Sequence, residues 1–160
     1  MADEKPSVYV ETTVVSYLTA RSTRDILMAA HQQATREWWD VAPRLFYLCT
    51  SQFVIDEASG GDAAAAAERL AVLSNISLLP IPAETESLAD QLLRRGALPL
   101  KARLDAIHLA VAAISGVRYL CTWNCRHLAN VQLRPKIELA CLDAGFQAPL
   151  ICTPLELNEA

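Results

Sequence analysis

The chain has 160 residues, of which 52% are hydrophobic and 20% charged, and its formal net charge is −4. This length and composition predict one folded domain, residues 1–160, and exclude a disordered chain. The negative charge excludes a protein that coats nucleic acid by bulk positive charge, while a local basic rim around a site stays compatible with it.

Short apolar segments alternate with helical patterns along the whole chain. Strands are predicted at 8–10, 44–50, 77–81, 118–122 and 149–153. Helices are predicted at 12–18, at 22–40 with Pro43 as its end, after Ser51, after Asp62, at 84–95, from Pro99 to Gly116, and up to 144. This order predicts an α/β fold with a mainly parallel sheet between two layers of helices.

Targeting and redox features point to a cytoplasmic protein. No run of about 18 apolar residues occurs, so we expect no transmembrane helix and no membrane partner. The opening residues MADEKPS lack the basic-then-apolar order of a secretory signal. The five cysteines lie mostly in apolar stretches, which predicts buried, reduced thiols.

Acidic and amide side chains are predicted to meet at one edge of the sheet. Glu11 ends the first strand and Asn124 follows the strand at 118–122. Glu57 lies on the helix after the second strand, and Asp105 lies on the helix that leads into the fourth. Ligands of open α/β sheets bind beyond the carboxyl ends of the strands, so these four residues are the candidate site.

Such a cluster of acids needs a counter-charge. Two carboxylates about 4 Å apart repel by roughly 4 kcal/mol at an effective dielectric near 20. Oxygen ligands without a partnered histidine or cysteine suit Mg²⁺ or Mn²⁺, which activate water and stabilise phosphoryl transfer. Taken singly, Glu11 and Asn124 are also typical helix caps, and Glu57 and Asp56 are equally good residues of a solvated helix face.

Three segments resemble the PIN domain family, and especially its VapC-like toxins. They are VYVETTVVSYL, SQFVIDEAS and LDAIHLAVAAISGVRYLCTWNCRHLAN. Glu57 rather than Asp56 falls on the family's helix glutamate, Asp105 on its helix acid, and Thr122-x-Asn124 on its Thr-x-Asp. The resemblance extends from about residue 8 to 151.

The resemblance implies a three-layer α/β/α sandwich with a five-stranded sheet and a Mg²⁺- or Mn²⁺-dependent endoribonuclease. It implies a toxin with a cognate antitoxin, assembled as a homodimer. Catalytic residues would be Glu11, Glu57, Asp105 and Asn124, the first three holding metal. Residues for RNA contact would be Thr13, Lys101, Arg103, Thr122 and Arg126, with His127 as a further candidate.

Two positions depart from the family pattern and keep other functions open. Glu11 and Asn124 stand where the family has aspartates, which leaves three carboxylates for metal. One alternative is therefore a catalytically degenerate module that binds RNA or protein. Another is a metal-assisted phosphohydrolase acting on small phosphate esters.

Two further patterns have both a structural and a functional interpretation. The spacing of Cys121, Cys125 and His127 fits no common zinc motif, which disfavours a zinc site. The apolar stripe of 22–41 is either core or, as in related toxins, part of an antitoxin interface.

Overall fold

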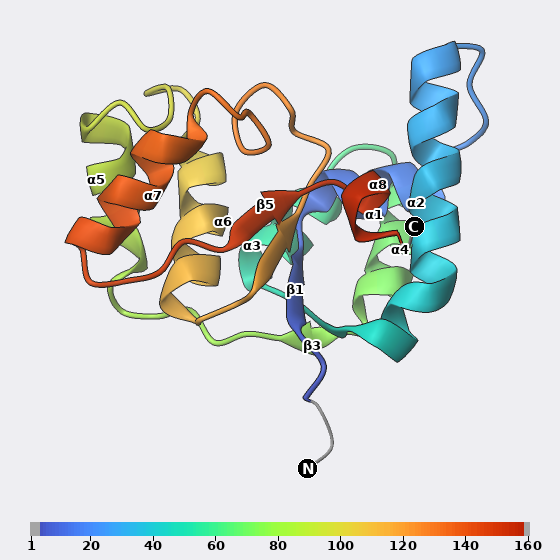
Figure 1. Cartoon of the computed structure of the whole chain (residues 1–160). Helices are drawn as coiled ribbons and strands as arrows, with labels where there is room; N and C mark the ends of the chain where they lie inside the picture. The colour runs from blue at the N-terminus through green and yellow to red at the C-terminus, as the bar shows by residue number, and fades with distance from the viewer. Residues whose placement is uncertain (1–3, 159–160) are drawn as a thin grey trace.

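The computed structural model describes residues 4–158, and its centre is a five-stranded parallel sheet (Figure 1). The strands are β1 (Ser7–Val10), β2 (Tyr47–Thr50), β3 (Ser77–Leu78), β4 (Tyr119–Cys121) and β5 (Leu150–Cys152). They lie in the order β3-β2-β1-β4-β5, and every pairing is parallel. The predicted α/β class and five-stranded sheet are confirmed.

Helices cover the sheet on both sides. Their bounds are α1 (Thr12–Thr19), α2 (Ile26–Leu45), α3 (Gln52–Ala58), α4 (Ala63–Leu73), α5 (Thr85–Arg94), α6 (Arg103–Ile114), α7 (Arg134–Asp143) and α8 (Pro154–Leu157). Helices α5, α6 and α7 form one layer, and the others form the second layer around α1 and α2 (Figure 1). This is the three-layer sandwich that the resemblance implied.

Strand β1 occupies the middle of the sheet, with β2 on one side and β4 on the other. Val8, Tyr9 and Val10 are therefore fully buried, as an unbroken apolar run in a parallel strand predicts. The carboxyl ends of β1, β2 and β4 lie next to one another, because all three strands run in the same direction. Whatever follows these strands shares one edge of the sheet.

Helix α2 differs from its prediction at both ends. It begins at Ile26 and runs to Leu45, so Pro43 lies inside it and does not end it. A proline near the end of a helix removes a single backbone hydrogen bond, and here the Ala42 carbonyl still accepts from Phe46 N at 2.8 Å. Strand β2 consequently begins at Tyr47, later than predicted.

Helix α6 also differs from its prediction. It begins at Arg103, and Pro99 lies in the preceding turn. The helix is buried all round from Ala106 to Ala113, because α6 packs against α5 and shares the core with the strands. Gly116, with a φ of 71°, ends the helix as predicted.

The structure shows the burial of the cysteines and the apolarity of the helices. Four of the five cysteines are buried and all are free, while Cys125 is exposed. Within residues 4–158, no helix has the length and apolarity needed to cross a membrane. Residues 1–3, which open the segment tested for a secretory signal, lie outside the described part of the chain.

Candidate active site

Glu11 is the buried acid at the centre of the carboxyl edge. It follows β1 directly and serves as the N-cap of α1, with only 3% of its surface exposed. Its Oε2 accepts hydrogen bonds from Thr13 N at 3.1 Å, Thr13 Oγ1 at 2.5 Å and Thr122 Oγ1 at 2.8 Å. Residues following two adjacent strands, β1 and β4, therefore hold this one oxygen.

Burial has a cost for the Glu11 carboxylate. Loss of water raises its pKa above the ordinary value, and this outweighs the nearby charge of His108 and the hydrogen bonds from Thr13 and Thr122. Its other oxygen, Oε1, forms no hydrogen bond with a residue in 4–158. This atom is not fully buried, so solvent reaches it. The open oxygen of Glu11 is the atom that a cation could contact.

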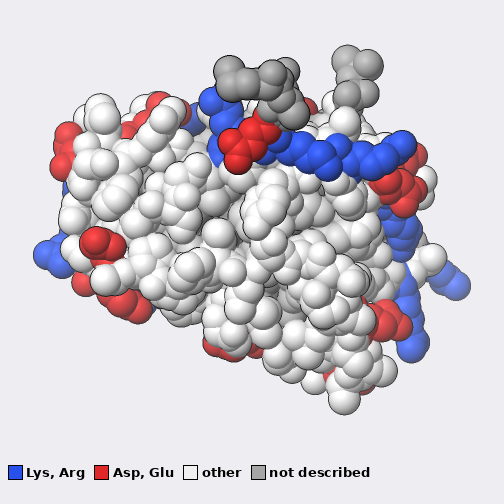
Figure 2. Space-filling view, turned by 90° about the horizontal axis from the view of Figure 1, so that it is seen from below, with Lys and Arg blue, Asp and Glu red and all other residues white. Residues whose placement is uncertain are grey.

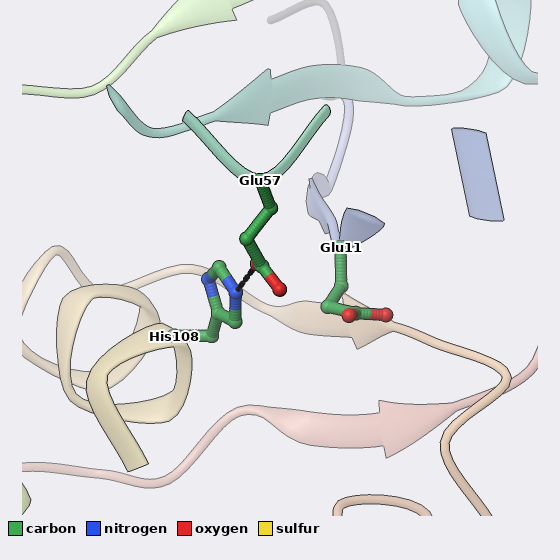
Figure 3. Close-up of side chains that lie close together, drawn as sticks. All are labelled: Glu11, Glu57 and His108. Atoms are coloured by element: carbon green, nitrogen blue, oxygen red, sulfur yellow. Dashed lines mark hydrogen bonds and ion pairs between the residues drawn. The ribbon is translucent and has the colours of Figure 1, made fainter. Parts of the chain in front are cut away.

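Glu57 ends a chain of hydrogen bonds that crosses the core. Its Oε1 accepts from Thr12 Oγ1 at 2.8 Å and lies 2.5 Å from Nε2 of His108 (Figure 3). The other ring nitrogen of His108 lies 2.7 Å from the hydroxyl of Tyr9, which is 2.7 Å from Ser51 Oγ. Because His108 is fully buried, these bonds fix the orientation of its ring.

The ionised form of Glu57 is stabilised by its neighbours. Burial alone raises its pKa, but the hydrogen bond and charge of His108 and the bond from Thr12 lower it below the ordinary value. The second carboxylate oxygen of Glu57 points away from His108, on the side of Glu11 (Figure 3). Glu57 is therefore ionised and presents one free oxygen towards Glu11.

These side chains fit a divalent cation. Ligands about 2.1 Å from an octahedral ion lie about 3.0 Å apart when adjacent and about 4.2 Å apart when opposite. One ligand atom from each of Glu11, Glu57 and His108 lies within 4.8 Å of the other two. The 2.5 Å between Glu57 Oε1 and His108 Nε2 is a hydrogen bond, shorter than the spacing of two ligands. The free oxygens of Glu11 and Glu57 would hold the ion, and His108 would position Glu57.

Asp105 and Asn124 belong to an adjoining group. Asp105 Oδ2 lies 3.0 Å from His127 Nδ1, and Asn124 Oδ1 accepts from His127 N at 3.1 Å. Asn124 N donates to Thr122 Oγ1 at 3.0 Å, which links this group to Glu11. The carboxyl ends of the strands thus bring a carboxylate oxygen of Glu11 within 4.8 Å of one of Glu57, and Asn124 is linked to Glu11 through Thr122. Asp105 contacts His127 instead of the pair of glutamates.

The predicted RNA-contacting cations have different surroundings. Arg103 forms ion pairs with Glu86 and Asp90 of α5, so its guanidinium is occupied. Lys101 and Arg126 are exposed, and neither forms an ion pair with a residue in 4–158. Thr13 and Thr122 are hydrogen-bonded to Glu11, and their hydroxyl groups are not free for RNA.

His108 is the site residue that the sequence argument did not identify. It lies in a run of apolar residues on α6, where a histidine is typical of a satisfied core position. The available sign was its spacing from Asp105, because residues three apart in a helix share a face. The prediction of acids without a histidine partner is therefore wrong for Glu57, which His108 contacts.

The other candidate ligands do not gather. Within residues 4–158, Glu11, Glu57 and His108 form the one set of three acid, histidine or cysteine side chains close enough to hold an ion. Cys121 is buried, Cys125 is exposed and His127 bonds to Asp105, so these three do not form a zinc site. Asp56 is exposed and bonds to Gln52, which leaves Glu57 as the acid of α3 that faces the site.

A hollow lies at the opposite end of the strands, and none of the candidate residues lines it. Its volume is about 1150 Å³, and its walls include Trp39, Phe46, Tyr47 and Tyr119. Figure 2, seen from below, shows that uncharged residues make up most of the corresponding side of the molecule, with charged residues mainly at the margin. The acids and this hollow are therefore separate features at opposite ends of the strands.

Comparisons with known proteins identify the fold. No protein-family model and no curated protein matches the sequence. The sarcin-ricin loop cleaving toxin VapC20 of Mycobacterium tuberculosis is similar in structure, with a TM-score of 0.58 and 18% identity over 89% of this chain and 99% of that one. VapBC2 from Rickettsia felis, solved bound to a DNA fragment from its promoter, has a TM-score of 0.58 and 12% identity over 92% and 98%. At these identities the likeness concerns the fold, which is VapC-like and of the PIN type.

Proposed function

We propose that the protein is a metal-dependent endoribonuclease and the toxin of a toxin–antitoxin pair. The observation that carries the proposal is the pair of free carboxylate oxygens on Glu11 and Glu57, at the carboxyl edge of a VapC-like sheet. The similar structure from Mycobacterium tuberculosis is that of a sarcin-ricin loop cleaving toxin. Mg²⁺ and Mn²⁺ are the proposed ions, since carboxylate oxygens suit both.

In the proposed reaction, water attacks the phosphorus of an RNA phosphodiester and the bond to O3′ breaks, leaving a 5′-phosphate and a 3′-hydroxyl. A bound divalent cation would supply positive charge to the phosphate and lower the pKa of the attacking water. Glu11 and Glu57 hold the ion, Thr13 and Thr122 orient Glu11, and His108 orients Glu57. Asp105 and Asn124 act beside them, where Asp105 accepts a proton from the attacking water and Asn124 positions the phosphate.

Asp105→Asn is expected to lower Mn²⁺-dependent RNA cleavage by about 100-fold, because an amide cannot accept the proton. Cleavage of a labelled RNA with Mn²⁺, with Mg²⁺ and with EDTA measures the effect. Asp56→Asn is the matched control, since this exposed acid on α3 faces away from the site. Equal cleavage by Asp105→Asn and wild type would contradict the role of Asp105, and cleavage undiminished by EDTA would contradict metal dependence.

A second candidate function is binding of RNA or protein without cleavage. The contact between His108 and Glu57 favours it, because that hydrogen bond already engages one of the two acids without an ion. Asn124 also favours binding without cleavage, because its amide adds no negative charge where the family has an aspartate. RNA binding that is unaffected by Mn²⁺, together with no cleavage, would favour this function over the first.

An antitoxin and a second copy of the chain are the proposed protein partners. Figure 1 shows the N-terminal half of α2 projecting beyond the body of the molecule, and its Ile26, Leu27 and Met28 are 87%, 67% and 40% exposed. Trp38, further along α2, is fully buried. The stripe of 22–41 therefore divides into an exposed part suited to a partner and a part in the core.

A further inference from the structure

Three aromatic rings from separate elements stack beside the candidate active site. Tyr17 lies on α1, His31 on α2 and Trp123 in the segment after β4. The rings of His31 and Trp123 are 4.1 Å apart at an angle of 14°. The ring of Tyr17 lies 5.9 Å from Trp123 and 6.2 Å from His31, at angles of 22° and 20°. The three rings are nearly parallel and form one continuous aromatic cluster.

The cluster is fixed on its inner side and open on its outer side. Trp123 is buried, and its Nε1 donates to Thr35 Oγ1 at 2.8 Å. Tyr17 and His31 are partly exposed. The Tyr17 hydroxyl and the His31 ring nitrogens bond with no described residue and are not among the buried atoms that lack a partner, so they face water. Tyr17 and His31 are therefore supported by Trp123 and are partly open to solvent.

The cluster is connected to the proposed catalytic acid through one residue. Trp123 N donates to Thr13 Oγ1 at 2.8 Å, and this hydroxyl donates to Glu11 Oε2 at 2.5 Å. A molecule that contacts Glu11 through a cation and extends along α1 would reach these rings. The cluster thus lies where a substrate bound at the acids would continue.

Two exposed arginines lie in the loop that joins the helices of Tyr17 and His31. Arg21 and Arg24 lie in the loop between α1 and α2, and both are exposed without an ion pair to a residue in 4–158. The loop is held against α2, because Gln32 Nε2 donates to the Arg21 carbonyl at 3.4 Å. Aromatic rings bordered by arginines are the usual means of binding single-stranded nucleic acid.

We propose that Tyr17 and His31 stack on an unpaired base of the RNA next to the scissile phosphate, while Arg21 and Arg24 contact its backbone. The inference rests on the proposed function and assigns the contact with an unpaired base to Tyr17 and His31, because a base within a duplex has no free face for stacking. Stacking tolerates any base, so the cluster positions the strand and does not read its sequence.

The test measures the binding of a labelled single-stranded RNA of about 12 nucleotides by fluorescence anisotropy. EDTA is present so that no cleavage occurs. Tyr17→Leu and His31→Leu are each expected to weaken binding by about tenfold, and Tyr17→Phe is expected to bind as wild type because it keeps the ring. Tyr47→Leu is the matched control, since this tyrosine lies at the opposite edge of the sheet. A fully paired RNA is expected to bind less tightly and equally to all of these proteins.

An abasic nucleotide gives the sharper result. Removing one base should weaken wild-type binding, and Tyr17→Leu should bind intact and abasic RNA with the same affinity. Unchanged RNA affinity in both leucine variants would overturn the inference. Variants that lose binding to an antitoxin but keep their RNA affinity would also overturn it, because the cluster would then be a protein interface. Because the assay uses neither metal nor cleavage, failure here is distinct from failure of the proposed ribonuclease activity.

Discussion

Glu11→Gln is expected to lower RNA hydrolysis by about 100-fold or more while leaving the fold intact. The change removes the negative charge from the proposed cation site. It preserves the structure because a glutamine oxygen still accepts the hydrogen bonds from Thr13 and Thr122 that hold Glu11 Oε2. Cleavage assays with Mn²⁺ measure the loss. Glu68→Gln, an exposed residue of α4, is the matched control.

The same variant has a distinctive effect on stability. Burial raises the pKa of Glu11 above its ordinary value of 4.5. At pH values between the ordinary pKa and the pKa in the folded protein, the folded state therefore binds more protons than the unfolded state. The free energy of unfolding therefore falls as pH rises through this window, and the stability that protonation contributes is present only below it. Glu11→Gln lacks this loss, so without metal it should equal or exceed wild type in stability at neutral pH. Urea unfolding in EDTA across acidic and neutral pH measures the difference, and parallel curves would contradict it.

His108→Leu is expected to destabilise the protein by about 2–4 kcal/mol and to reduce RNA cleavage as well. The change removes two buried hydrogen bonds, to Tyr9 and to Glu57, from a fully buried position. Cleavage falls because Glu57 loses the contact that orients it. Thermal unfolding should show the loss as a decrease in Tm of several degrees.

Two comparisons make the His108 result specific. Tyr9→Phe removes the hydrogen bonds of the Tyr9 hydroxyl with Ser51 and His108. It should lower the free energy of unfolding by less, about 1 kcal/mol, because Glu57 keeps its contact with His108. Because the pKa of Glu57 is lowered in the folded protein, its ionisation stabilises the fold at pH values above the ordinary glutamate pKa. That stability is lost as pH falls through the pKa of the folded state. This loss in acid should disappear in His108→Leu. Equal stability of His108→Leu and wild type would show that the bonds through His108 contribute nothing.

The parallel sheet and the position of Glu11 and Glu57 at the carboxyl ends of its strands could be predicted from the sequence, because apolar segments alternate with helices along the whole chain. The order of the strands, which places β1 between β2 and β4, is a finding of the structure. Glu11 and Glu57 accordingly lie at one edge. Helix ends were less predictable, as Pro43 shows, because a proline in the last turn removes only one hydrogen bond.

The partners of individual side chains could not be predicted, since they depend on tertiary contacts. His108 resembles a core residue in the sequence, and only the packing of α6 brings it to Glu57. Arg103 resembles a phosphate-binding residue beside Asp105, but α5 supplies two acids that pair with it. Asp105 itself contacts His127 from the segment after β4. All of these contacts join α6 to other elements, and the sequence does not show how those elements align with it.

Calorimetric titration with Mn²⁺ tests the central claim most directly, because it measures the cation site without requiring the right RNA. Wild type and Glu68→Gln are predicted to bind the ion alike, and Glu11→Gln is predicted to lose that binding. Such a result would establish a cation among the acids at the carboxyl edge of the sheet. No binding to the wild type, or equal binding to Glu11→Gln, would contradict the claim that Glu11 and Glu57 form a metal site.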